Sequence, residues 1–175
     1  LFGYANPIEA MGAERFADAV KAADADGVLV VDYPPEEAHK LVEMLDARAL
    51  DTIFLLAPTT SDARLKQVAT LGRGYLYYVS LKGVTGAANI DLADVTRRLD
   101  RIRCFTALPV GVGFGIRDAQ TAQRIAAVAD AVVIGSRLVQ EIEISAHDQV
   151  TGNVRAFMSG VREAMDVVGK VEAAT

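Results

Sequence analysis

The stretch Ser80-Leu81-Lys82-Gly83-Val84-Thr85-Gly86 directly follows the apolar and aromatic run Tyr75–Val79. Two later stretches repeat this arrangement, because Gly113-Phe114-Gly115 and Gly135-Ser136 each follow a short apolar run. Glycine lets the backbone come close to a ligand, and a Gly-Ser step that opens a helix offers free N–H groups and the positive end of the helix dipole. The three turns therefore predict one phosphate site built mainly from backbone amides.

The chain around these turns alternates short apolar runs with amphipathic segments. The apolar runs are continuous rather than alternating, which is typical of strands buried on both faces of a parallel sheet. Each amphipathic segment carries apolar residues at helical spacing. We expect strands at Leu1–Tyr4, Val28–Val31, Thr52–Leu56, Tyr75–Val79, Val110–Val112 and Ala131–Ile134. We expect helices at Glu9–Ala23, Glu36–Arg48, Ala63–Leu71, Leu92–Phe105, Asp118–Ala129 and Gly152–Val168, with a short helix opened by Gly135-Ser136.

This βα alternation fits two α/β architectures, an open doubly wound sheet or a TIM (β/α)8 barrel. A doubly wound sheet places its glycine signature after the first strand, and the sequence has none there. The glycine turns instead follow the last strands, where barrels hold phosphate. We therefore predict a barrel represented by strands three to eight, with the first two expected before Leu1, and one incomplete domain over residues 1–175.

Composition narrows the class of function. Hydrophobic residues make up 51% of the chain and charged residues 23%, which is typical of a globular domain. The net charge of −5 argues against a nucleic-acid or acidic-membrane surface. No apolar run approaches the roughly 18–20 residues of a membrane span, and the single cysteine, Cys104, has no internal disulfide partner. These features predict a soluble, cytoplasmic protein.

Isolated polar residues add weaker signals. Asp32 ends a buried strand at the face where barrels do chemistry, and an orienting role suits it better than catalysis because no second acid lies nearby. Tyr77 and Tyr78 must point to opposite sides of their strand, so that one faces the barrel interior. His39 and His147 lie in polar surroundings and are predicted to be solvated. No metal-binding motif occurs, so we expect no protein-bound metal.

The sequence also resembles the tryptophan synthase alpha chains from Leu1 to about Gly169. The resemblance is carried, in the family's order, by Tyr4–Pro7, Val30–Glu37, Phe54–Thr60, Tyr78–Gly86, Val112–Ile116 and Gly135-Ser136. It implies a TIM-barrel lyase of tryptophan biosynthesis that cleaves indole-3-glycerol phosphate, in a retro-aldol sense, to indole and glyceraldehyde 3-phosphate. It further implies a cytoplasmic α2β2 heterotetramer in which the beta chain holds pyridoxal phosphate and this chain holds no cofactor.

Matching the family's motifs assigns roles to individual residues. The resemblance implies that the substrate phosphate binds the amides of Gly86, Gly115, Gly135 and Ser136. It implies an indole pocket of Phe2, Leu29, Tyr77, Phe114 and Val133. It implies loop closure through Asp32, Gly83 and Thr85, and contact with the beta chain around Asn6, Pro7 and Gly12.

The two catalytic acids of the family have no counterpart in this sequence. The resemblance places a glutamate on the second strand and an aspartate in the loop after it, so both would precede Leu1. We therefore expect no catalytic residue in this chain and negligible lyase activity of the chain alone. Two alternatives stay open: another phosphate-binding barrel such as indoleglycerol-phosphate synthase, and a non-catalytic fragment that only binds a beta chain.

Overall fold

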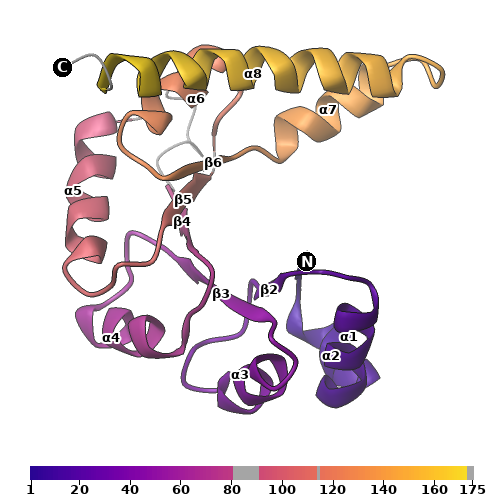
Figure 1. The fold of residues 1–175 in the computed structure, drawn as a ribbon, viewed down its shortest axis with the longest axis vertical. Helices are drawn as coiled ribbons and strands as arrows, with labels where there is room; N and C mark the ends of the chain where they lie inside the picture. Colours follow the sequence, from indigo (N-terminus) through magenta and orange to yellow (C-terminus); the bar gives the residue numbers. More distant parts are fainter. Residues whose placement is uncertain (81–90, 114, 173–175) are drawn as a thin grey trace. The chain divides into compact units, whose positions relative to one another are not determined.

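The computed structural model describes residues 1–80, 91–113 and 115–172. In these residues, short strands alternate with helices along the chain (Figure 1). The strands are β1 Phe2–Gly3, β2 Gly27–Val30, β3 Asp51–Leu56, β4 Leu76–Val79, β5 Val110–Gly113 and β6 Ala131–Val133. The helices are α1 Ala5–Met11, α2 Ala13–Ala22, α3 His39–Asp46, α4 Asp62–Leu71, α5 Leu92–Arg103, α6 Ala119–Ala126, α7 Ser136–Ile144 and α8 Val150–Glu172.

The strand order follows the sequence, β1-β2-β3-β4-β5-β6, so each strand lies beside the next one along the chain. The pairs β1–β2, β2–β3, β3–β4 and β5–β6 are all parallel. A doubly wound sheet reverses its strand order at a switch point, whereas a barrel keeps sequence order. The observed order therefore confirms the predicted α/β class and the connectivity of a partial (β/α)8 barrel.

The chain forms two compact units. The first comprises Leu1–Tyr78 with Arg101–Val110, and the second comprises Val79–Asp100 with Gly111–Thr175. Each unit is described below by itself, and the prediction of a single domain stays a prediction.

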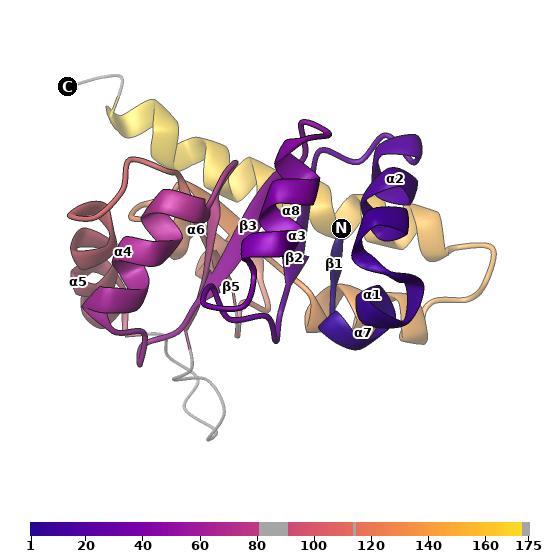
Figure 2. The same ribbon diagram turned by 90° about the horizontal axis from the view of Figure 1, so that it is seen from below.

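In the first unit, helices α1 to α3 cover one face of β2 (Figure 2). Val28 and Val30 lie on this face and pack in a cluster with Ile8, Val20 and Leu45 from the helices. Because side chains alternate along a strand, Leu29 points to the opposite face of the sheet. The continuous apolar run of β2 is therefore explained by burial on both faces, since Leu29 is 1% exposed.

The predicted helix over Glu9–Ala23 is wrong in one respect, because the structure has two helices there. Gly12 separates α1 from α2 with φ 87°, a conformation that favours glycine. Pro7 lies in the first turn of α1. An N–H in the first turn has no helical acceptor, so proline is tolerated there.

In the second unit, α8 is the longest helix of the described part and packs against both α6 and α7. Val161 of α8 is buried, and Ala122 and Ile125 of α6 are fully buried. Asp118 caps α6, because its Oδ1 accepts a hydrogen bond of 2.7 Å from the Thr121 N–H. None of the helices in the described residues is long and apolar enough to cross a membrane.

Candidate functional site

The carboxyl ends of β5 and β6 bring two of the predicted phosphate turns together. Gly113 and Val133 are register partners in this parallel pair. Gly115 and Gly135 each follow this registered pair by two residues, so both turns emerge at the same edge of the sheet. Ser80 also reaches this edge, because its N–H donates a hydrogen bond of 3.1 Å to the Gly113 carbonyl. The edge is therefore where an amide-built site can form.

The backbone of these turns is open to a ligand. Gly115 is exposed and has φ 76°, a left-handed conformation that disfavours any side chain. Gly135 and Ser136 are exposed, and a Cβ added at Gly135 would meet nothing within 4 Å. Space for a ligand group thus lies directly beside the Gly135 backbone.

Helix α7 begins at this edge without a side-chain cap. The N–H groups of Leu138 and Val139 donate to the Gly135 carbonyl at 2.9 and 3.1 Å, which closes the first turn. Within the described residues, the N–H groups of Ser136 and Arg137 precede the first helical hydrogen bonds and have no acceptor inside the helix. Such unsatisfied donors, together with the helix dipole, favour an anion at this position.

Other predicted residues of this site are not described by the structure. Gly83, Thr85 and Gly86, assigned to loop closure and to the phosphate, lie outside the described residues, as does Phe114 of the indole pocket. Val133 is half-buried at the end of β6 in the second unit.

The sheet face opposite the helices of the first unit gathers three predicted indole-pocket residues. Phe2 and Leu29 are register partners on β1 and β2, and the Phe2 and Tyr77 rings meet edge to face with centroids 5.8 Å apart. Tyr78, on the other face of β4, is 2% exposed. The structure therefore identifies Tyr77 as the tyrosine that points away from the helices, and burial raises its pKa, with Tyr75 adding to the effect.

A cavity of about 470 Å³ opens on this face. Phe2, Leu29, Ile53 and Tyr75 supply its apolar lining, and Asp26 and Asp51 lie among its other residues. Phe2 remains 60% exposed, so a flat apolar surface is available to an aromatic ligand. Asp26, Asp51 and Tyr75 stand at the amino ends of β2, β3 and β4, so the cavity lies toward that end of the strands.

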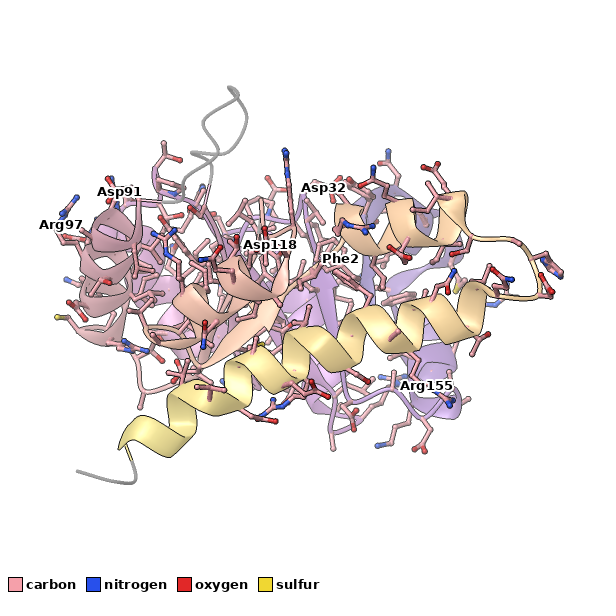
Figure 3. All side chains as sticks on the ribbon, turned by 90° about the horizontal axis from the view of Figure 1, so that it is seen from above. Phe2, Asp32, Asp91, Arg97, Asp118 and Arg155 are labelled. Carbon is pink, nitrogen blue, oxygen red and sulfur yellow. The ribbon has the colours of Figure 1, made fainter. Side chains whose placement is uncertain are left out.

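Asp32, labelled in Figure 3, lies two residues after the carboxyl end of β2 and bonds to the first residue of α1. Its Oδ1 accepts a hydrogen bond of 2.8 Å from the N–H of Ala5, the first residue of α1. The next residue, Tyr33, donates from its hydroxyl to Glu9 Oε1 at 3.1 Å. Burial, followed by the Glu9 contact, raises the Tyr33 pKa. The sequence predicted an orienting role for Asp32, but it gave no sign of the Glu9–Tyr33 pair.

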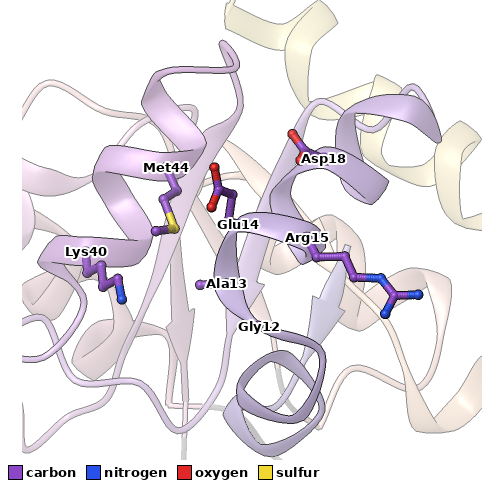
Figure 4. A pocket seen from close by; sticks show the side chains of 7 residues that line it. All are labelled: Gly12, Ala13, Glu14, Arg15, Asp18, Lys40 and Met44. Carbon is purple, nitrogen blue, oxygen red and sulfur yellow. The ribbon is translucent and has the colours of Figure 1, made fainter.

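A separate groove of about 510 Å³ lies between α2 and α3 (Figure 4). Figure 4 shows Met44 and Lys40 on α3 turned toward Ala13 and Glu14 on α2, whereas Arg15 extends away from them. Gly12, one of the predicted beta-chain contacts, lies at the end of the groove. Its lining mixes charges of both signs and selects no obvious ligand.

Within residues 1–80, 91–113 and 115–172, no group of three or more His, Cys, Asp or Glu side chains could hold a metal ion. His39 and His147 are both exposed, as predicted.

Comparison with known proteins gives one consistent result. The sequence profile described as "Tryptophan synthase alpha chain" matches residues 1–166. The tryptophan synthase alpha chain of Azoarcus sp. (strain BH72) is 58% identical over 172 residues, which is 98% of this chain and 64% of that relative. The corresponding chain of Laribacter hongkongensis (strain HLHK9) is 58% identical over 95% of this chain and 62% of its own length.

Solved structures agree with the sequence relatives. The crystal structure of tryptophan synthase subunit alpha from Legionella pneumophila str. Paris has a TM-score of 0.81 and 34% identity, covering 95% of this chain and 62% of that chain. The tryptophan synthase complex from Pyrococcus furiosus has a TM-score of 0.79 and 30% identity, covering 93% and 65%. This chain therefore spans less than two thirds of the length of each of these relatives.

Proposed function

Because the chain belongs to the tryptophan synthase alpha chain family, we propose that it carries much of the substrate site for cleavage of indole-3-glycerol phosphate to indole and glyceraldehyde 3-phosphate. The observation that carries the proposal is the shared edge of β5 and β6, where Gly115 and Gly135 follow a registered pair. The family match favours this reading over the sibling barrel, indoleglycerol-phosphate synthase.

The phosphate would bind through backbone amides. Gly135 and Ser136 would donate from the uncapped start of α7, and Gly115 from the neighbouring turn. Gly86 would complete this set. Amide donors at a helix start hold a phosphate dianion without needing a lysine or arginine, which agrees with the absence of a cation at these four positions.

The indole ring would lie on the apolar sheet face. Phe2, Leu29 and Tyr77 share this face in the first unit. The family resemblance also assigns Phe114 and Val133 to the indole pocket, and Gly83, Thr85 and Asp32 to loop closure. An apolar enclosure excludes water, which strengthens the electrostatic interactions of the reacting groups.

The cleavage needs two proton transfers. A general acid protonates indole C3 while a base removes a proton from the glycerol hydroxyl, so that the carbon–carbon bond breaks. Residues 1–175 supply no counterpart of the family's two acids. We therefore expect the 175-residue polypeptide by itself to bind phosphate ligands but to release no measurable indole.

The partner would be a tryptophan synthase beta chain in the cytoplasm. Alpha chains of this family need no cofactor, and pyridoxal phosphate belongs to the beta chain. Asn6 and Pro7 are exposed at the start of α1, and Gly12 is exposed at its end, so this helix is available for such contact.

One experiment separates an enzyme fragment from a binding module. Indole release is measured for the purified chain, with and without a segment of a relative's alpha chain that carries both acids. Release only when the segment is added supports the proposal, whereas release by the chain alone contradicts the assignment of the acids. Stable binding to a beta chain without any rescue would instead indicate a non-catalytic module.

A further inference from the structure

We propose that Arg137 is a positioning residue for the phosphate turn, because it links the first turn of α7 to Phe157 on α8 and pairs with Glu141 one turn further along α7. The inference rests on the proposed phosphate function of Gly135 and Ser136. It goes beyond that function by naming what fixes those two residues in place.

Arg137 makes a strong contact along its own helix. Its Nη2 donates to Glu141 Oε2 at 2.6 Å, one turn further along α7. The two side chains are only 25% and 15% exposed, so solvent screens this pair less than an ordinary surface ion pair. The guanidinium is thus held at a defined place rather than free in solvent.

The same guanidinium reaches the neighbouring helix. Its Cζ lies 5.1 Å from the centroid of the Phe157 ring on α8, within the range of a cation–π interaction. Nη1 is buried and has no hydrogen-bond partner among the described residues, which indicates that the group is enclosed by its neighbours. Figures 1 and 3 both show α7 running beside the first half of α8.

A second bridge joins the end of α7 to the first turn of α8. The Ser145 hydroxyl donates to the Glu141 carbonyl at 2.6 Å, and the Asn153 side chain donates to that hydroxyl at 2.9 Å. Asn153 lies on α8, so α7 is held at both ends. Among the described residues, the contact of Arg137 with Phe157 holds the first turn of α7 against α8.

The position of Arg137 in the chain explains how its contacts would affect phosphate binding. Arg137 directly follows Ser136, and its side chain extends toward Glu141, away from the start of the helix. It therefore orients the turn without itself supplying the cation. It also neutralises the Glu141 carboxylate, which would otherwise repel an anion near the start of α7.

The positioning role can be tested without any ligand. In Arg137→Met, we expect the amides of Leu138 and Val139 to exchange hydrogen about tenfold faster, since a cation–π contact and a shielded ion pair are lost. Arg162→Met is the matched control, because Arg162 also pairs with an acid one turn along its helix, Asp166, but is 70% exposed. The Leu29 amide in the first unit serves as the reference for global unfolding.

The second arm measures phosphate binding by titrating glycerol 3-phosphate and following the Gly135 and Ser136 amide signals. We expect binding about three- to tenfold weaker in Arg137→Met, unchanged in Arg162→Met and partly restored in Arg137→Lys, which keeps the charge but not the planar group. Unchanged exchange at Leu138 and Val139 in Arg137→Met would overturn the positioning role, and so would unchanged affinity. Absence of any shift in the unsubstituted chain would instead contradict the proposed function, while the exchange arm would still decide the role of Arg137.

Discussion

Replacing Gly135 by alanine separates the stability of the chain from its capacity to bind phosphate. The backbone of Gly135 has φ −116°, on the side of the Ramachandran map that alanine adopts. A Cβ built there has no heavy atom within 4 Å. The folded chain therefore has no steric reason to reject the methyl group.

The Gly135→Ala substitution should leave stability intact but weaken phosphate binding. Alanine restricts the unfolded chain, so the free energy of unfolding should stay unchanged or rise by about 0.4–1 kcal/mol. A ligand that lies against the Gly135 backbone would meet the methyl group and lose at least one charge-assisted hydrogen bond, worth about 1.5–3 kcal/mol. The dissociation constant for glycerol 3-phosphate should then increase about 10- to 100-fold.

The assay pairs urea unfolding with isothermal titration of glycerol 3-phosphate. Gly115→Ala is the contrasting variant, because φ 76° at that residue should cost about 1–2 kcal/mol of stability in addition to any effect on binding. If Gly135→Ala binds the ligand as tightly as the parent chain, the phosphate does not lie against Gly135. A decrease of more than about 1 kcal/mol in the free energy of unfolding of Gly135→Ala would show that the space beside Gly135 is not open.

Three further substitutions test the fold itself. Gly27→Ala should lower the free energy of unfolding in urea by about 1–3 kcal/mol, since its Cβ would lie 2.7 Å from the Asp51 carbonyl oxygen, and an unchanged value would refute that close approach. Leu29→Ala should cost about 2–5 kcal/mol in the same assay because the side chain is 1% exposed, and a cost below about 1 kcal/mol would contradict its burial. The Asp118 carboxylate should make the chain about 0.3–1 kcal/mol more stable than Asp118→Asn at pH 7. The hydrogen bond from the Thr121 N–H is the main cause that lowers the Asp118 pKa. The stability advantage of the carboxylate should therefore disappear as the pH falls from about 4, which thermal unfolding at several pH values would measure. An advantage that grew on acidification would contradict the lowered pKa.

Much of the fold followed from local patterns that the sequence displays directly. Continuous apolar runs such as Thr52–Leu56 predicted buried parallel strands, and β3 covers Asp51–Leu56. The turns at Gly115 and Gly135 could be placed at one edge because carboxyl ends of parallel strands coincide. Helix boundaries were less accurate, since the helix expected from Glu36 begins at His39.

Contacts between elements could not be read from such patterns. Tyr33 and Glu9 are 24 positions apart, and their meeting depends on how α1 rotates against the end of β2. The cation–π contact of Arg137 depends in the same way on the packing of α7 against α8. For Arg137, the spacing to Glu141 offered the one local signal, because residues four apart lie on the same helix face.

The hydrogen bond from Ala5 to Asp32 has a consequence for the order of folding. Helix α1 has seven residues and no side-chain cap from within its own segment, so it is too short to persist alone in water. The Asp32 side chain that satisfies its first N–H is 27 positions away, at the end of the second strand. Helix α1 therefore gains its cap only after β1 and β2 have paired. An isolated peptide of residues 1–12 should show little helix by circular dichroism, and in refolding experiments α1 should become protected no earlier than the β1–β2 ladder.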